Sequence, residues 1–228
     1  MALAHNPQIV RNGLVLYLDA ANPRSYPGSG PTWTDLSGQG NNFTMIGNLT
    51  YSSGSFISTA STANYFIRNP FNHPTNLLTV EMWCRADSGS SADSLWSYAI
   101  SSADNNHQLL YEQTNLTIYA PNFTAVSSGI NIADNTWRQI IRTSNRSTGE
   151  ELLYLNGILA FTATLAPGIN FISGGSLVLA QEQDDVAGAL DANQSFQGSY
   201  SIFRIYNRIL NLSEVRQNFE ATRDRYGI

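Results

Sequence analysis

Short apolar runs separated by clusters of Gly, Asn, Ser and Pro recur along the chain. This punctuation is typical of an all-β protein, in which each run is a strand and each cluster a turn. The clearest turn is Asn156-Gly157, because Asn-Gly tolerates the positive φ angles that both central residues of a type I′ turn require. The pattern predicts strands at 13–20, 65–68, 77–86, 95–101, 108–113, 115–120, 137–144, 150–156, 158–164, 176–181 and 199–206.

One helix is predicted near the C-terminus. Asn211 is a suitable N-cap, and Glu214 three residues later completes a capping box. Helical spacing then predicts a buried face and a solvated face. The buried face would carry Val215 and Phe219 with Leu212 adjoining, and the solvated face Arg216, Glu220 and Arg223.

The length of 228 residues and a hydrophobic content of 42% fit one β domain with a sizeable core. No apolar run approaches the ~18 residues that span a bilayer. The N-terminus has no basic region followed by an apolar core, so no secretory signal is predicted. We therefore expect one domain over residues 1–228 without a linker or repeat.

Charged residues are sparse, except in one loop near the C-terminus. Glu182, Asp184 and Asp191 fall close together there, beside the amides of Gln183 and Gln194. In an extended segment residues two apart point the same way, so Glu182 and Asp184 are expected to converge. Carboxylate, amide and main-chain oxygens are the ligands of hard cations such as Ca²⁺. The alternative interpretation is a solvated acidic loop without a ligand.

The net charge supports a local acidic site. The chain has 12 basic and 17 acidic residues and a net charge of −5. Two divalent cations would offset most of a cluster of that size. No Lys/Arg stripe is present, so nucleic acid is not an expected partner. The excess of acidic over basic residues is equal to the number of acids around the proposed site, which are Asp104, Asp184, Asp185, Asp191 and Glu182.

The loop from Gln181 to Gly198 resembles the calcium loop of the pentraxins. The pattern Gln-Glu-Gln-Asp, six residues, an acid, two residues, Gln and a later Gly is matched without a gap, with Asp191 where that family usually has Glu. A second pentraxin segment, an Asp-Asn pair after a Ser-Tyr-Ala strand, is matched by Asp104-Asn105. The resemblance implies two Ca²⁺ ions to which the ligand binds directly. Their implied ligands are Asp104, Asn105, Glu182, the main-chain carbonyl of Gln183, Asp184, Asp191 and Gln194.

The rest of the chain resembles laminin-G-like domains of the concanavalin-A-like superfamily. The segment Asp35-Leu36-Ser37-Gly38-Gln39-Gly40-Asn41 and the ending Tyr206-Asn207-Arg208 through Glu214 carry this similarity. Both ends are similar to such domains in bacteriophage structural proteins. The resemblance implies a two-sheet antiparallel jelly-roll sandwich with one C-terminal helix.

The cysteine content departs from the pentraxin pattern. Pentraxins join two core strands by a disulfide, but Cys84 is the single cysteine here. The first pentraxin cysteine matches Glu81, and the second matches either Ile141 or Arg142. If the match is Arg142, an ion pair with Glu81 is expected to replace the disulfide. Cys84 itself lies in a strand pattern and is expected to be a small core residue.

Catalysis is not expected. Glucanases of this scaffold need two carboxylates across the glycosidic bond, and no Glu-x-Asp-x-Glu strand occurs. Glu150 and Glu151 are adjacent, so their side chains would point to opposite faces of a strand. The three histidines are far apart and match no catalytic or zinc motif. They are His5, His73 and His107, the last of which lies near the proposed ligand face.

Three functional hypotheses follow. The first is a calcium-dependent, lectin-like module that binds carbohydrate or another surface polymer. The second is a structural virion protein, a capsid decoration or a tail or fibre component, in which Ca²⁺ stiffens a loop. The third, a glycan-cleaving enzyme, is disfavoured by the missing carboxylate pair. The first two predict a virion or extracellular location, with other virion proteins and further copies of the chain as candidate partners.

Overall fold

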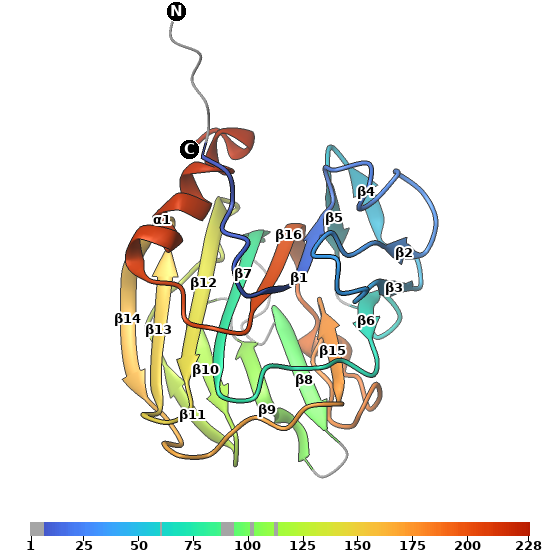
Figure 1. Cartoon of the computed structure of the whole chain (residues 1–228). Helices are drawn as coiled ribbons and strands as arrows, with labels where there is room; N and C mark the ends of the chain where they lie inside the picture. The colour runs from blue at the N-terminus through green and yellow to red at the C-terminus, as the bar shows by residue number, and fades with distance from the viewer. Residues whose placement is uncertain (1–6, 60, 88–93, 101–102, 112–113) are drawn as a thin grey trace, which may run out of the picture.

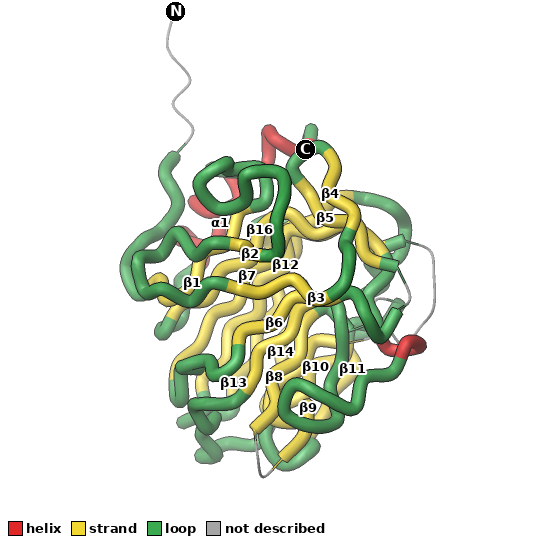
Figure 2. The backbone as a smooth tube through the Cα atoms, turned by 90° about the vertical axis from the view of Figure 1, so that its right-hand side faces the viewer, coloured by secondary structure: helices red, strands yellow, loops and turns green. Residues whose placement is uncertain are grey.

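The computed structural model describes residues 7–59, 61–87, 94–100, 103–111 and 114–228, and for 103–109 and 111 it describes only the backbone. Two antiparallel sheets of eight strands face each other (Figures 1 and 2). Sheet A has the order β14-β13-β12-β7-β16-β5-β4, with β1 also paired to β16. Sheet B has the order β11-β10-β9-β8-β15-β6-β3-β2. The predicted all-β sandwich is therefore confirmed.

The strand bounds agree with most of the predicted ranges. The strands of sheet A are β1 (Leu14–Asp19), β4 (Thr50–Ser52), β5 (Ser55–Ser58), β7 (Leu77–Ala86), β12 (Trp137–Asn145), β13 (Glu150–Leu155), β14 (Ile158–Thr164) and β16 (Gly198–Tyr206). Those of sheet B are β2 (Thr32–Trp33), β3 (Phe43–Ile46), β6 (Tyr65–Arg68), β8 (Trp96–Ile100), β9 (Ala103–Tyr111), β10 (Thr117–Ala120), β11 (Thr124–Ser127) and β15 (Ser176–Leu179). Five short strands, β2 to β5 and β11, were not predicted.

The main core lies between the sheets. In β8, Trp96, Tyr98 and Ile100 point into it, as alternation along a strand requires. Leu177 and Leu179 of β15 do the same. The intervening residues of these two strands therefore face away from the core, on the outer surface of sheet B. That outer surface carries the candidate site.

The Asn156-Gly157 turn has the predicted geometry. It joins β13 to β14, and its residues have φ angles of 49° and 78°. Positive φ at both positions is the signature of a type I′ hairpin turn.

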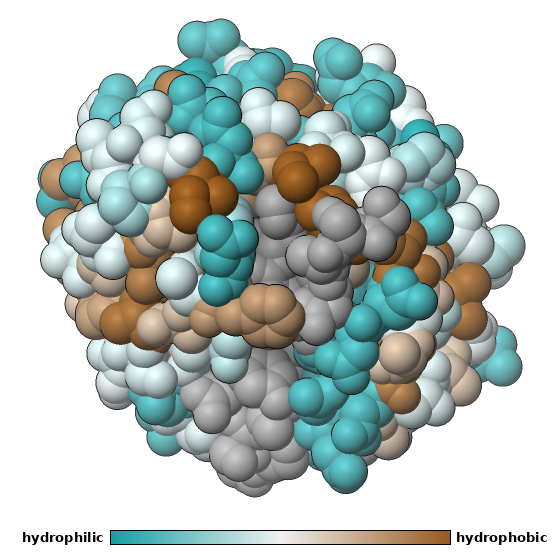
Figure 3. Space-filling model, turned by 90° about the horizontal axis from the view of Figure 1, so that it is seen from below, coloured by the Kyte–Doolittle hydropathy of each residue, from teal (hydrophilic) through white to brown (hydrophobic). Residues whose placement is uncertain are grey.

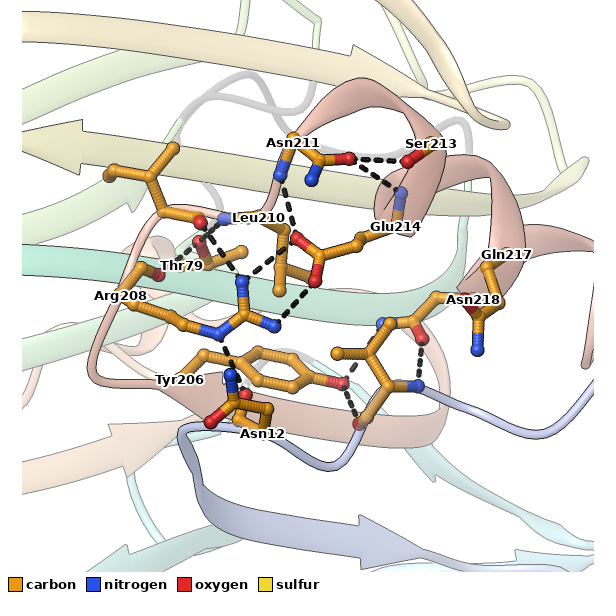
Figure 4. A network of polar contacts seen from close by, with 12 residues as sticks. Asn12, Thr79, Tyr206, Arg208, Leu210, Asn211, Ser213, Glu214, Gln217 and Asn218 are labelled. Atoms are coloured by element: carbon orange, nitrogen blue, oxygen red, sulfur yellow. Dashed lines mark hydrogen bonds and ion pairs between the residues drawn. The ribbon is translucent and has the colours of Figure 1, made fainter.

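The C-terminal helix α1 (Leu212–Glu220) lies on the outer surface of sheet A, and a 3₁₀ turn, η2 (Arg223–Tyr226), follows it (Figure 1). The predicted capping box is present, with Asn211 accepting from Glu214 N and Glu214 accepting from Asn211 N. Figure 4 shows the bidentate pair between Arg208 and Glu214 that fixes the start of the helix. Leu212, which was predicted to adjoin the buried face, is 42% exposed.

The buried face of α1 is partly polar. Val215 is fully buried as predicted, and the second fully buried side chain is Asn218. Asn218 Oδ1 accepts from Val10 N at 2.8 Å, and its Nδ2 donates to Tyr206 Oη at 2.9 Å (Figure 4). This side chain thus joins the helix to β16 and to the N-terminal segment.

The suggested ion pair between Glu81 and Arg142 does not form. Glu81 is directly opposite Ile141 in the sheet, so Arg142 points to the other surface of sheet A. Glu81 instead pairs with Arg204 at 2.7 Å. Arg142 pairs with Glu151 at 2.9 Å, between the two sheets. Both ion pairs are fully buried.

Cys84 is a buried core residue, as predicted. Burial in apolar surroundings raises the pKa of its thiol to about 12. The thiol is therefore neutral in the folded protein at physiological pH.

Candidate metal centre on sheet B

The loop that follows β15 begins with a sharp change of direction. Ala180 has a φ of 71°, a left-handed conformation that ends the strand two residues before its predicted end at Gln181. Gln181 then fixes the turn, because its Oε1 accepts from Glu182 N at 2.8 Å and its Nε2 donates to Ser61 O at 3.0 Å. The chain leaves the sheet plane at this point and folds over the outer surface.

Small side chains on the outer surface of sheet B leave room for this loop. Ser97 and Ala99 alternate with the core residues of β8, and Ser176 stands opposite Ala99 in β15. All three are fully buried although they face away from the core. The loop is the cover that buries them, since Ser97 Oγ donates to Gln181 O at 2.9 Å.

The side chain of Gln183 anchors the loop to these strands. Its Nε2 donates to Ser97 O at 3.1 Å and to Ser176 O at 3.1 Å. Its Oε1 accepts from Ser176 Oγ and from Ala187 N. A buried amide with this many partners is fixed in position. Gln183 therefore holds the loop in place through its side chain, and only its main-chain carbonyl remains as the predicted metal ligand.

The predicted carboxylates differ in exposure. Glu182 is 2% exposed, whereas Asp184 and Asp191 are exposed. Residues 181–184 form no strand, so the expected alternation that would aim Glu182 and Asp184 the same way does not apply. The left-handed Ala180 and the two anchored glutamines explain this difference, because they fix the backbone in an irregular path.

Asp191 precedes a short 3₁₀ turn, η1 (Ala192–Gln194), and Gln194 is its last residue. Asp191 is its N-cap, and Asp191 Oδ1 accepts from Asn193 N at 2.9 Å. Gln194 is half-buried, and its main-chain oxygen accepts from Ser94 N at 3.0 Å. The turn is thus tied to the segment that leads into β8.

Asp185 has a different role from its neighbour Asp184. Its main chain exchanges hydrogen bonds with Gly188, and its Oδ1 accepts from Val186 N at 2.7 Å. This carboxylate therefore stabilises the turn at the tip of the loop.

Sheet topology brings the second predicted segment to the same region. β8 lies between β9 and β15, so β9 runs one strand away from the loop that covers β15. Residues 104–105 follow Ala103, which pairs with Ile100, and a β-bulge occurs where Tyr98 pairs with both Asn106 and Gln108. Bulges of this kind redirect side chains and are common beside functional sites. The side chains of Asp104, Asn105 and His107 lie outside the described residues.

The described part of the loop does not form a complete metal site. Among the described side chains, no three of the types His, Cys, Asp and Glu lie close enough together to hold a metal ion. The predicted metal ligands in the loop nevertheless all offer oxygen atoms, which fit a hard cation such as Ca²⁺. A site built on this loop needs ligands from a second segment, and β9 is the neighbouring one.

Glu150 and Glu151, the adjacent carboxylates considered for catalysis, lie on opposite faces of sheet A. Glu150 is exposed, whereas Glu151 is fully buried and pairs with Arg142 and Arg146. The prediction that the two side chains point to opposite faces is confirmed. His73 is 2% exposed and stacks on Tyr98 with the ring centroids 4.2 Å apart. His5 lies outside the described residues.

The outer surface at the lower end of the sandwich is mixed in character. In Figure 3 the hydrophobic residues form small separate groups among hydrophilic ones. No helix in the described part of the chain is long and apolar enough to cross a membrane.

Comparison with known proteins identifies the fold family. The family profile of the concanavalin A-like lectin/glucanases superfamily, of laminin-G type, matches residues 58–216. The chain belongs to this superfamily. Most of the two-sheet sandwich falls within the matched range, including all of the candidate loop.

Relatives of this superfamily member include several pentraxins. Human neuronal pentraxin-2 is 30% identical over 138 residues, which are 60% of this chain and 32% of that protein. Human pentraxin-4 is 32% identical over 68% of this chain and 34% of its own length. The match thus spans about a third of these relatives. C-reactive protein 1.4 of Limulus polyphemus is 26% identical over 61% of this chain and 60% of its own length.

Solved structures share the fold at low identity. The heptameric SAP-like pentraxin of Limulus polyphemus has a TM-score of 0.59 at 19% identity, covering 73% of this chain and 82% of that one. The binding domain of Paraclostridial Mosquitocidal Protein 1 has a TM-score of 0.69 at 16% identity, covering 92% and 52%. A botulinum neurotoxin type C structure, described by its dependence on two ganglioside molecules for cell entry, has a TM-score of 0.66 at 15% identity, covering 93% and 52%.

Proposed function

We propose that this protein is a non-enzymatic, calcium-dependent binding module that recognises carbohydrate or another hydroxyl-rich surface polymer. The observation that carries the proposal is the loop over sheet B. Gln183 anchors this loop to β8 and β15, and β9 is the next strand. The loop carries the exposed carboxylates of Asp184 and Asp191. The pentraxin relatives and the lectin superfamily support the same function.

In this proposal the ligands are divided between two segments. Glu182, the Gln183 carbonyl, Asp184, Asp191 and Gln194 come from the loop, and Asp104 and Asn105 come from β9. Together they would hold two Ca²⁺ ions. Bound Ca²⁺ supplies open coordination positions for ligand oxygens. The residues of the chain fix the loop and neutralise the ions.

Gln183 and the two serines below it give the loop its preorganisation. Their hydrogen bonds keep the carboxylates near their positions without metal, so less ordering is needed on binding. The acidic side chains repel one another when no cation is present, and cation binding removes that repulsion.

A second candidate function is structural, with Ca²⁺ stiffening the loop in an assembled particle. The residues at both ends that are similar to bacteriophage structural proteins favour it, and they favour a virion location for either function. Further copies of the chain and other virion proteins are the partners that this role would require. An extracellular location suits the carbohydrate-binding role equally.

Thermal unfolding with Ca²⁺ or with excess chelator tests the metal proposal. A ligand that binds only the folded state adds about 2.7 kcal/mol at a hundredfold excess over Kd. We expect a higher Tm with Ca²⁺, and a much smaller rise with Mg²⁺ because Mg²⁺ demands compact octahedral geometry. Unchanged melting in all three conditions contradicts the metal site.

Glycan-array binding then separates the two functions. Calcium-dependent glycan binding that is lost in chelator supports the lectin-like function. A calcium-dependent rise in Tm without any glycan binding supports the structural role.

A further inference from the structure

A surface groove lies away from the calcium loop, at the junction of three distant chain segments. It has a volume of about 450 Å³. Its walls come from the β6–β7 connection, from the segment before β15 and from the residue after β16. In Figure 1 the β6–β7 connection crosses the lower ends of the strands on its way to β7. None of the predicted calcium ligands lines this groove.

The polar lining consists of short carboxamide and hydroxyl side chains. Asn72, Asn76 and Asn207 supply three carboxamides, and Thr75 and Ser173 supply two hydroxyls. All five residues are exposed. No described lining residue carries a charge, although His73 lies buried at the base. A charged ligand would find no counter-charge in this groove.

The exposed surface of the groove is more apolar than polar. Pro74 and Leu77 are half-buried and line the same groove. They offer an apolar surface to the C–H face of a small ligand. A few fixed polar groups beside apolar surface are the usual composition of a small-molecule site, and the volume falls within the range of about 300–1,000 Å³ for such sites.

The walls of the groove are held by hydrogen bonds to neighbouring elements. Thr75 O accepts from Phe171 N at 2.9 Å, which joins the first two segments. Asn207 N donates to Gly13 O at 2.9 Å, which fixes the third. Asn76 Oδ1 accepts from Ser147 Oγ at 3.1 Å. The groove is therefore formed before any ligand binds.

We infer that this groove is a saccharide site that works without calcium and takes a neutral, hydroxyl-rich ligand. A carboxamide both donates and accepts, so it matches the paired hydroxyls of a sugar, and three carboxamide residues line this groove. The absence of charge from the described lining favours neutral over acidic sugars. This inference does not rest on the calcium site, and the two sites respond differently to chelation.

Saturation-transfer NMR on the full chain in excess chelator tests the inference. The probes are glucose, galactose, N-acetylglucosamine and lactose, with sialic acid as the acidic comparison. We expect saturation transfer to at least one neutral probe and none to sialic acid. No transfer to any neutral probe overturns the inference, and it leaves the calcium-dependent function untouched.

Two exposed positions locate the binding. Asn72→Ala and Asn207→Ala each remove a carboxamide from the groove, and we expect about tenfold weaker binding of the neutral probe. The matched control is Thr162→Ala, an exposed β14 residue that lines a different surface pocket. Unchanged melting of all three variants shows that they are folded. If Thr162→Ala weakens binding and the two asparagine variants do not, the assignment to this groove is wrong.

Discussion

Asn218 Nδ2 donates a hydrogen bond of 2.7 Å to Glu81 Oε2, and this contact joins α1 to the centre of sheet A. The other carboxylate oxygen, Glu81 Oε1, accepts from Arg204 at 2.7 Å and from Gln139 at 3.0 Å. All four side chains are fully buried. Burial alone would lower the pKa of Arg204, but Glu81 chiefly, with Tyr17 and Tyr206, holds it above its usual value.

The first prediction concerns this buried pair. Glu81→Leu and Arg204→Met each leave one buried charge without its partner, and we expect a loss of about 3–5 kcal/mol in the free energy of unfolding. The double variant removes both charges, so it should recover much of that loss. Urea unfolding of the four proteins measures the coupling. Additive losses in the double variant would show that the two residues act independently.

The second prediction separates two adjacent carboxylates. Asp184→Asn removes a proposed calcium ligand, so calcium affinity should fall strongly. Asp185→Asn removes the same charge, but that carboxylate accepts from Val186 N within the turn. Its effect on calcium affinity should be limited to salt-screened attraction. Isothermal titration at two salt concentrations measures both. Equal losses would mean that the loop is a diffuse acidic patch.

The third prediction concerns the anchor of the loop. Gln183→Ala removes the side-chain donor from Ser97 O and Ser176 O, and it leaves Ala187 N with only its hydrogen bond to Ser176 Oγ. We expect a loss of about 1–3 kcal/mol in stability. Calcium affinity should fall as well, because the loop would need ordering on binding. Melting and titration with Ca²⁺ check the two effects. A variant as stable as the parent protein would show that the loop does not depend on this side chain.

The fourth prediction is a pH dependence at the start of α1. The hydrogen bonds from Arg208 lower the pKa of Glu214 below its ordinary value of 4.5. Because the folded pKa is the lower one, this stabilisation is present above pH 4.5 and is lost as the pH falls through the folded pKa.

Glu214→Gln isolates that effect, because it removes the charge and retains a capping acceptor. It should lower stability by about 0.5–1 kcal/mol at neutral pH. The difference from the parent protein should vanish in acid, where Glu214 is protonated. Urea unfolding across this pH range measures it. Glu220→Gln, at an exposed pair with Arg223, is the control and should change little. A difference that persists in acid would show that the charge is not the cause.

The fifth prediction concerns Cys84. Its buried thiol, with a pKa raised to about 12, should not react with a disulfide reagent at pH 8 in the folded protein. Unfolding in urea should release one reactive thiol. Rapid labelling without denaturant would show that β7 opens locally on the timescale of the assay.

The sequence predicts those strands whose apolar runs are long and clearly bounded. β7 and β14 match the predicted ranges of 77–86 and 158–164 at both ends. β3, β4 and β5 were not predicted because they have four, three and four residues in a segment rich in Gly, Asn and Ser. Such strands are held by their neighbours in the sheet, and their own sequence carries little β signal.

The candidate site is predictable in part, for a topological reason. The resemblance to pentraxins implies that residues 104–105 and the loop 181–194 form one site, and in the fold β9 and the loop after β15 lie on either side of β8. The anchoring role of the Gln183 side chain is not predictable from that spacing. Ser97 and Ser176 carry the missing signal, because both are small polar residues at outward positions of core strands.

Buried polar contacts are the least predictable part of the fold. Helical spacing places Asn218 beside Val215, but polarity suggests a solvated residue. Its burial is stabilised by Glu81, Tyr206 and Val10, which are far apart in the sequence. Only the assembled structure brings these partners together.

Glu81 occupies the position where the resemblance to pentraxins places a disulfide cysteine, and its network crosslinks the middle of sheet A without a covalent bond. Thiol reductants and oxidants should therefore leave this fold equally stable, since its one cysteine is buried and has no partner to bridge. The stability of sheet A depends on the presence of α1 and not on redox conditions. Proteolytic removal of α1 would take Asn218 away from Glu81 and expose the charged Glu81 carboxylate in the sheet. The C-terminal segment therefore stabilises the middle of sheet A.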